Sequence, residues 1–142
     1  MKLSAQTIQI IKVTVAPITV NSETIAQKMY EILFTDFPQT EVLFEGADLS
    51  QHKKLAVAIS AYAQNIDNLE VLSYAIEEIT KTHVLAKVQA EHYPMVGLSL
   101  LKAIKHVLGD IATDEVLDAW REAYFFLADI LIAKEKELYA QA

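Results

Sequence analysis

His83 is the residue whose type and position most clearly suggest chemistry. It is one of four histidines and follows Ile76 and Ile79 at helical spacing, which predicts that its side chain lies on the buried face of a helix. A neutral imidazole there offers one nitrogen lone pair to the interior and needs a partner for its other nitrogen. That partner is either a metal or cofactor or an ordinary hydrogen bond, and a lone histidine leaves both interpretations open.

Tyr30, Gln51 and Glu135 are polar residues at positions that continue apolar helical stripes. Glu135 is the most demanding, because it follows Leu127 and Leu131 at helical spacing and an isolated buried carboxylate is costly. It therefore either has a partner inside the protein or lies at the edge of its stripe and reaches solvent. Gln51 in turn is either a pocket residue or a surface glutamine at the start of a helix.

Composition limits the classes of function. The chain has 142 residues and no cysteine, so we expect a single domain over 1–142 without thiol catalysis or thiolate metal sites. A net charge of −7 without a Lys/Arg cluster argues against nucleic acid or an anionic membrane surface as partner. No apolar run approaches the ~20 residues of a bilayer span, and the N-terminus lacks a signal peptide pattern. We therefore expect a cytoplasmic protein without stable membrane insertion.

The elements that must position these side chains are expected to be helices. Three glycines and three prolines favour long helices with short connections. We expect helices over about 4–18, 22–35, 50–66, 71–88, 93–109 and 114–139, with a short helical turn near Pro38 that breaks at Gly46. Pro17 should distort the end of the first helix. Strand-like alternation is absent, so the predicted fold class is all-α, with seven to eight helices.

Read together, several segments resemble a bacterial single-domain haemoglobin, similar to the globin domain of flavohaemoglobins. The most specific is His83 followed nine positions later by His92-Tyr93-Pro94-x-Val96-Gly97. The other matching segments are Ile8-x-x-Ile11-Lys12, 29–34, 42–44, 51–55, 63–69, Ala119-Trp120 with Tyr124, and Glu135-x-x-Leu138-Tyr139. The resemblance covers essentially the whole chain and implies a globin fold around a haem pocket.

The resemblance implies haem b (iron protoporphyrin IX) as cofactor, with His83 as the axial ligand of the iron. Phe44, Leu55 and Val96 match positions that contact the haem. Tyr30 and Gln51 match the positions that donate hydrogen bonds to bound O₂, and CO and NO would be alternative ligands. His52 follows Gln51 directly and is the other candidate for that distal position. Leu55 lies four residues after Gln51, which is the family's spacing, so we favour Gln51.

Tyr93 and Glu135 match a network that hydrogen-bonds the axial histidine and tunes its basicity. This network is characteristic of globins that carry out redox chemistry as well as reversible binding. One departure is Thr82, because the family often has a basic residue just before the axial histidine; Lys81 is a possible substitute.

Two functions are implied: reversible O₂ binding for storage or delivery, and nitric-oxide dioxygenation, which converts NO and O₂ to nitrate. The sequence contains no GxGxxG-type motif, so the second function would need electrons from a separate reductase. A haem-based sensor is a third interpretation, and a helical bundle without haem is the alternative that lacks any cofactor.

Overall fold

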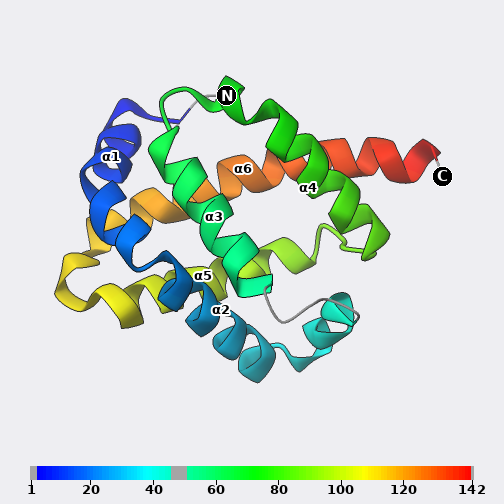
Figure 1. The fold of residues 1–142 in the computed structure, drawn as a ribbon, viewed down its shortest axis with the longest axis horizontal. Coiled ribbons are helices and arrows are strands. Elements are labelled where there is room, and N and C mark those ends of the chain that lie inside the picture. The colour runs from blue at the N-terminus through cyan, green and yellow to red at the C-terminus, as the bar shows by residue number, and fades with distance from the viewer. Residues whose placement is uncertain (1–2, 46–50, 142) are drawn as a thin grey trace.

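The structure, a computed structural model, describes residues 3–45 and 51–141. All regular structure within these residues is helical, which confirms the predicted all-α class (Figure 1). The elements in chain order are α1 (Ala5–Val20), α2 (Ser22–Asp36), η1 (Pro38–Phe44), α3 (Gln51–Gln64), η2 (Leu69–Leu72), α4 (Ser73–Leu85), α5 (His92–Leu108), η3 (Gly109–Ile111) and α6 (Asp114–Gln141). The predicted break at Gly46 and the predicted cap at Ser50 lie outside the described residues.

The first helix continues past the proline that was expected to distort its end. Ser4 caps α1 by accepting a hydrogen bond from the Thr7 backbone N–H. Pro17 lies inside the helix, which ends at Val20 rather than at Ile18. The backbone N–H and the side-chain amide of Asn21 both donate to the Pro17 carbonyl. These two bonds secure the last turn of α1. The bond that Pro17 cannot donate would have gone to the Val13 carbonyl one turn earlier, and α1 continues despite its loss.

The long helix α6 runs across the molecule (Figure 1). It packs against α1, α4 and α5, while α2 packs against α3 and α5, and α3 also contacts α1. Most of the buried apolar side chains form one cluster that includes Trp120, Ile11 and Ile104. A second, smaller cluster of Tyr93, Ala128 and Leu131 lies where α5 and α6 meet, and Ile76 and Ile79 of α4 pack against it.

Helix α4 differs at both ends from the helix expected over 71–88. Its start is preceded by the 3₁₀ turn η2, and it ends at Leu85. Lys87 adopts the left-handed backbone conformation, with φ of 66°, which stops the helix three residues before the predicted end. No helix within the described part of the chain is both long and apolar enough to cross a membrane.

Candidate functional site

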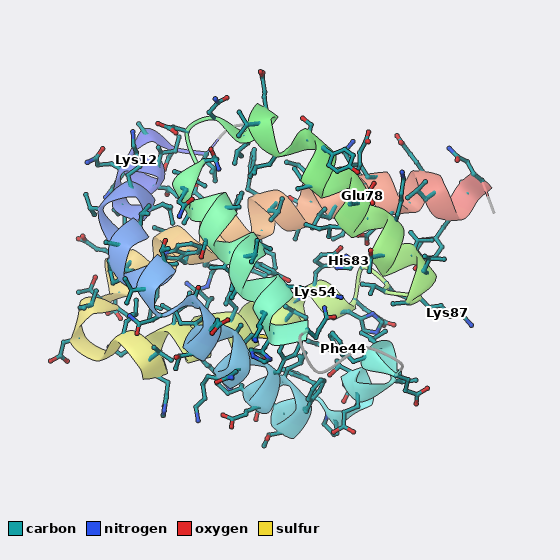
Figure 2. The ribbon with its side chains drawn as sticks, in the orientation of Figure 1. Lys12, Phe44, Lys54, Glu78, His83 and Lys87 are labelled. Atoms are coloured by element: carbon teal, nitrogen blue, oxygen red, sulfur yellow. The ribbon has the colours of Figure 1, made fainter. Side chains whose placement is uncertain are left out.

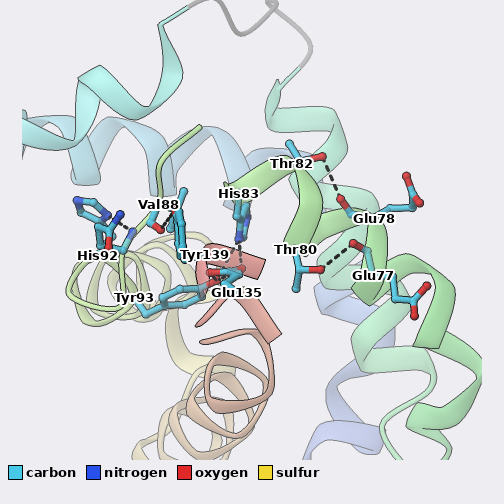
Figure 3. Close-up of polar contacts among 11 residues, drawn as sticks. Glu77, Glu78, Thr80, Thr82, His83, Val88, His92, Tyr93, Glu135 and Tyr139 are labelled. Atoms are coloured by element: carbon cyan, nitrogen blue, oxygen red, sulfur yellow. Dashed lines mark hydrogen bonds and ion pairs between the residues drawn. The ribbon is translucent and has the colours of Figure 1, made fainter. Parts of the chain in front are cut away.

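His83 lies in the last turn of α4, and both groups that hold its ring contact the same nitrogen (Figure 3). Its Nδ1 lies 2.9 Å from Oε2 of Glu135 and 3.0 Å from the phenol oxygen of Tyr93. A proton on Nδ1 can donate to either oxygen, and that tautomer leaves the Nε2 lone pair available. Within the described residues, Nε2 has no hydrogen-bond partner, and the His83 side chain is 32% exposed.

Glu135 is buried, with 3% of its surface exposed. The phenol of Tyr93 donates to its two carboxylate oxygens at 2.8 and 2.7 Å. Together with the contact to His83, these bonds are the partners that a buried carboxylate requires. The alternative in which Glu135 lies at the edge of its stripe and reaches solvent is therefore wrong. Burial raises the pKa of Tyr93, and the hydrogen bond to Glu135 raises it further, so the phenol remains a donor.

Three helix ends bring this network together: the last turn of α4, the first turn of α5 and the C-terminal part of α6 (Figure 3). Two more tyrosines of α6 hold the backbone around it. The phenol of Tyr124 donates to the Tyr93 carbonyl at 2.7 Å, and that of Tyr139 donates to the Val88 carbonyl at 2.6 Å. Neither residue was predicted to support the site, although Tyr139 follows Glu135 by four positions and so shares its helix face.

Tyr30 belongs to a group of aromatic side chains from α2 and η1. Its ring centroid lies 5.8 Å from that of Phe34 and 5.2 Å from that of Phe44, in an edge-on arrangement with Phe44. Burial raises the pKa of the Tyr30 phenol, and a hydrogen bond with the Gln51 side chain acts in the opposite direction. Tyr30 thus contacts both Gln51, the predicted second donor, and Phe44, the predicted haem-contacting phenylalanine.

The remaining predicted residues, Leu55 and Val96, are half-buried and pack against the edge of the main core cluster, as does Phe44. Figure 2 shows Phe44 on η1, Lys54 on α3 and His83 on α4 around the same region in its view. Lys81, the suggested substitute for a basic residue at Thr82, pairs with Glu78 of its own helix at 3.6 Å. His52 is half-buried, and the preference for Gln51 over it stays a prediction.

The chain resembles known proteins along most of its length. A family model described as Globin matches residues 27–131. A globin-like protein of Aquifex aeolicus is 50% identical over 139 residues, a match that covers 98% of this chain and 99% of that protein. The chain belongs to the globin family.

Two further relatives of this globin carry functional names. A flavohemoprotein of Xylella fastidiosa is 50% identical over 135 residues, which cover 93% of this globin and 34% of the relative, so this chain spans about a third of the flavohemoprotein. An engineered carbene transferase, built on a candidate nitric oxide dioxygenase from Rhodothermus marinus, superposes with a TM-score of 0.93 at 44% identity. That match covers 98% of this chain and 97% of the other.

The residues of this globin suit a haem group. The protein holds Nδ1 of His83 and leaves Nε2 available. One imidazole nitrogen is the ligand a protein supplies when the other ligands of the metal come from a macrocycle. Helix α4 carries His83 yet buries only Thr80 among its residues. The apolar side chains of Phe44, Leu55 and Val96 remain half-buried. These incompletely covered apolar surfaces are what contact with a flat apolar group requires.

Proposed function

We propose that this globin binds haem b through Nε2 of His83 and binds O₂ reversibly for storage or delivery, with CO and NO as alternative ligands. The main support for this proposal is the arrangement at His83, where Tyr93 and Glu135 hold Nδ1 and leave Nε2 without a partner among the described residues. Ferrous haem held by His83 would supply an iron that binds a diatomic ligand. Membership of the globin family supports the haem assignment.

On the axial side, Tyr93 and Glu135 orient the imidazole and set its basicity. The carboxylate accepts from the protonated Nδ1, which increases the electron density that Nε2 offers to a metal. Tyr93 donates to both carboxylate oxygens, so the carboxylate cannot rotate without breaking a bond. The tautomer and the direction of the axial nitrogen are therefore fixed by the protein before any ligand arrives.

Tyr30 and Gln51 would supply hydrogen-bond donors to the bound ligand, while Phe44, Leu55 and Val96 would supply apolar contact to the haem. A phenol O–H or an amide N–H stabilises the partial negative charge of a bound diatomic ligand. If each donor contributes about 1–2 kcal/mol, ligand affinity rises about five- to thirtyfold per donor. The hydrogen bond between Tyr30 and Gln51 keeps the two donor groups together.

A second candidate function is nitric-oxide dioxygenation with electrons from a separate reductase. The observation that favours it is the contact between the buried carboxylate of Glu135 and His83, because a carboxylate on an axial histidine favours the oxidised metal. The Rhodothermus marinus relative is named as a candidate nitric oxide dioxygenase, and other relatives are flavohemoproteins. Both observations support the same function. Tyr30, Gln51, Tyr93 and Glu135 would be the residues that serve this reaction.

The test of haem binding is an absorption spectrum of the purified protein, reduced with dithionite and then exposed to O₂. We expect a Soret band that shifts reversibly with O₂. The His83→Ala variant should lose haem on purification while its helical circular dichroism persists. His106→Ala, which replaces an exposed histidine in the last turn of α5, is the matched control and should keep its haem. Stoichiometric haem in His83→Ala would exclude His83 as the axial ligand.

The choice between carrier and enzyme requires a separate measurement. NO consumption is followed under air with an added flavin reductase and NADH, and nitrate is quantified as the product. Catalytic turnover that falls in Glu135→Gln would establish the dioxygenase. A single stoichiometric burst of NO consumption, followed by stable ferric protein, would leave O₂ binding as the function.

A further inference from the structure

We propose that Tyr139 is a positioning residue for His83: it fixes the backbone that follows the axial histidine, while Glu135, one turn earlier on α6, fixes the side chain. The inference rests on the proposed function, since it assumes that the direction of Nε2 matters. It concerns a residue outside the network of His83, Tyr93 and Glu135.

The backbone of His83 is held by the residues that end α4. The Val88 N–H donates to the His83 carbonyl at 2.9 Å, and the Lys87 N–H donates to the Val84 carbonyl at 3.1 Å. With Lys87 in the left-handed conformation, these two bonds form a Schellman motif. The His83 carbonyl is thus satisfied by a residue outside the helix, so its position depends on where Val88 lies.

Val88 in turn is held from α6. Its carbonyl accepts a hydrogen bond of 2.6 Å from the phenol of Tyr139. Its side chain packs against the cluster of Tyr93, Ala128 and Leu131. Val88 therefore connects the carbonyl of His83 to the C-terminal part of α6, through one hydrogen bond at its N–H and another, from Tyr139, at its carbonyl (Figure 3).

The two holding groups come from one face of one helix. Glu135 and Tyr139 are four residues apart, so their side chains lie next to each other on α6. Glu135 contacts Nδ1 of His83, and Tyr139 reaches the backbone five residues further along. The last turn of a helix frays readily, and this arrangement prevents fraying at the turn that carries the axial nitrogen.

Lys87 provides an independent reason for such a tether. A left-handed conformation is unfavourable for any residue with a Cβ, and glycine is the usual residue at this position of a Schellman motif. A strained residue persists only where its surroundings determine its conformation. The bond from Tyr139 to the next residue along the chain is such a constraint, which explains how lysine occupies a glycine position here.

The experiment uses the haem-loaded protein and the Tyr139→Phe variant, which loses only the hydroxyl. The matched control is Tyr62→Phe, because the Tyr62 phenol donates to the Ala123 carbonyl at 2.7 Å within the core. The readouts are the iron–histidine stretching band of the ferrous protein in resonance Raman spectra and the rate of haem transfer to apomyoglobin.

For Tyr139→Phe we expect a shifted or broadened band and haem transfer faster by about fivefold, the factor that corresponds to one ordinary hydrogen bond. Tyr62→Phe should lower Tm but leave the band unchanged. An unchanged band in Tyr139→Phe would overturn the positioning role, whatever happens to Tm.

A second measurement needs no haem and separates this inference from the proposed function. Hydrogen–deuterium exchange of the Val88 amide should accelerate in Tyr139→Phe and stay unchanged in Tyr62→Phe. Adding Lys87→Gly to Tyr139→Phe should restore part of the protection, because glycine adopts the left-handed conformation without strain. If the wild-type protein binds no haem, the proposed function fails, but the tether does not. Only unchanged exchange at Val88 in Tyr139→Phe would then overturn the tether.

Discussion

At the scale of single residues, the decisive property of His83 is that its two nitrogens are treated differently. Nδ1 faces two oxygen atoms within 3.0 Å, whereas Nε2 faces no polar partner among the described residues. A fully buried histidine would be expected to satisfy both nitrogens, whereas the His83 side chain is 32% exposed and its Nε2 remains open to a ligand. This asymmetry between the two nitrogens is the observation that favours the proposed axial role.

Replacement of Tyr30 by phenylalanine isolates the phenol hydroxyl. The ring contacts with Phe34 and Phe44 remain possible, so the variant should fold and bind haem. We expect the O₂ dissociation rate to rise about five- to thirtyfold, because one donor to the bound ligand is lost. Stopped-flow mixing measures this rate, with Tyr74→Phe, at a 76% exposed position, as the control. An unchanged rate would remove Tyr30 from the ligand side of the pocket.

Replacement of Glu135 by glutamine removes one negative charge beside His83 at almost constant volume. The ferric form loses more stabilisation than the ferrous form, so the midpoint potential should rise. A change of about 60 mV corresponds to a tenfold shift in the one-electron equilibrium, and we expect an effect of that order. Potentiometric titration of the Soret band measures it. Glu137→Gln, on the exposed side of the same helix, should leave the potential unchanged, and equal shifts in both variants would contradict the assignment.

The sequence predicted the residues of the network better than the residues that support it. The isolated positions of His83 and Glu135 on apolar faces identified them, and the family resemblance added Tyr93. Tyr124 and Tyr139 act on backbone carbonyls, and every residue has a carbonyl. No pairing of side-chain types therefore marks these contacts, and only the structure reveals them.

At the scale of elements, helix type and order followed from periodicity, while helix ends did not. The end of α4 was placed at Val88 because the sequence there has neither glycine nor proline to mark a stop. The actual stop depends on a lysine in a conformation that sequence patterns assign to glycine. Pro17 misled in the opposite direction, since α1 continues past it to Val20, and Asn21 donates twice to the Pro17 carbonyl in the last turn. The error at α4 arises where specific hydrogen bonds override the usual preference of the residue.

Gly97 allows α5 to approach α6 closely, which gives a prediction about this helix pair. A Cβ at this position would lie 2.7 and 2.9 Å from ring atoms of Tyr124, so Gly97→Ala should destabilise the protein by about 1–3 kcal/mol through overpacking. Urea denaturation monitored by circular dichroism measures the change.

The control for Gly97→Ala is the same substitution in a Tyr124→Ala background. There the obstructing ring is gone, and alanine should be neutral or stabilising because it favours the helix by about 1 kcal/mol over glycine. Equal destabilisation in the two backgrounds would show that the tight contact with Tyr124 is not the cause.

Across the whole molecule, tyrosines stabilise the site and the main core in the same way. Each of these tyrosines donates its phenol proton to a buried acceptor. Tyr62 in the core donates to the Ala123 carbonyl, Tyr124 between α5 and α6 donates to the Tyr93 carbonyl, and Tyr93 at the site donates to Glu135. Burial raises the pKa of all three phenols, and the charge of Glu135 raises it further for Tyr93 and Tyr124. Their protonation in the folded state therefore links stability to pH.

The sign of this linkage predicts alkaline instability. In the unfolded chain a tyrosine titrates near pH 10, whereas these three retain their protons in the folded chain at higher pH. Below pH 9 both states are protonated and the tyrosines add no pH dependence. Above pH 10 the unfolded state binds fewer protons, so the free energy of unfolding falls with a slope that approaches about 1.4 kcal/mol per pH unit for each tyrosine near pH 11. Urea denaturation between pH 9 and 11 measures the slope.

Tyr62→Phe should reduce that slope by about one third of the part due to the three tyrosines. The free energy of unfolding of Tyr62→Phe at pH 7 records the lost hydrogen bond separately. A slope that Tyr62→Phe leaves unchanged would mean that this phenol ionises alike in the folded and unfolded chain.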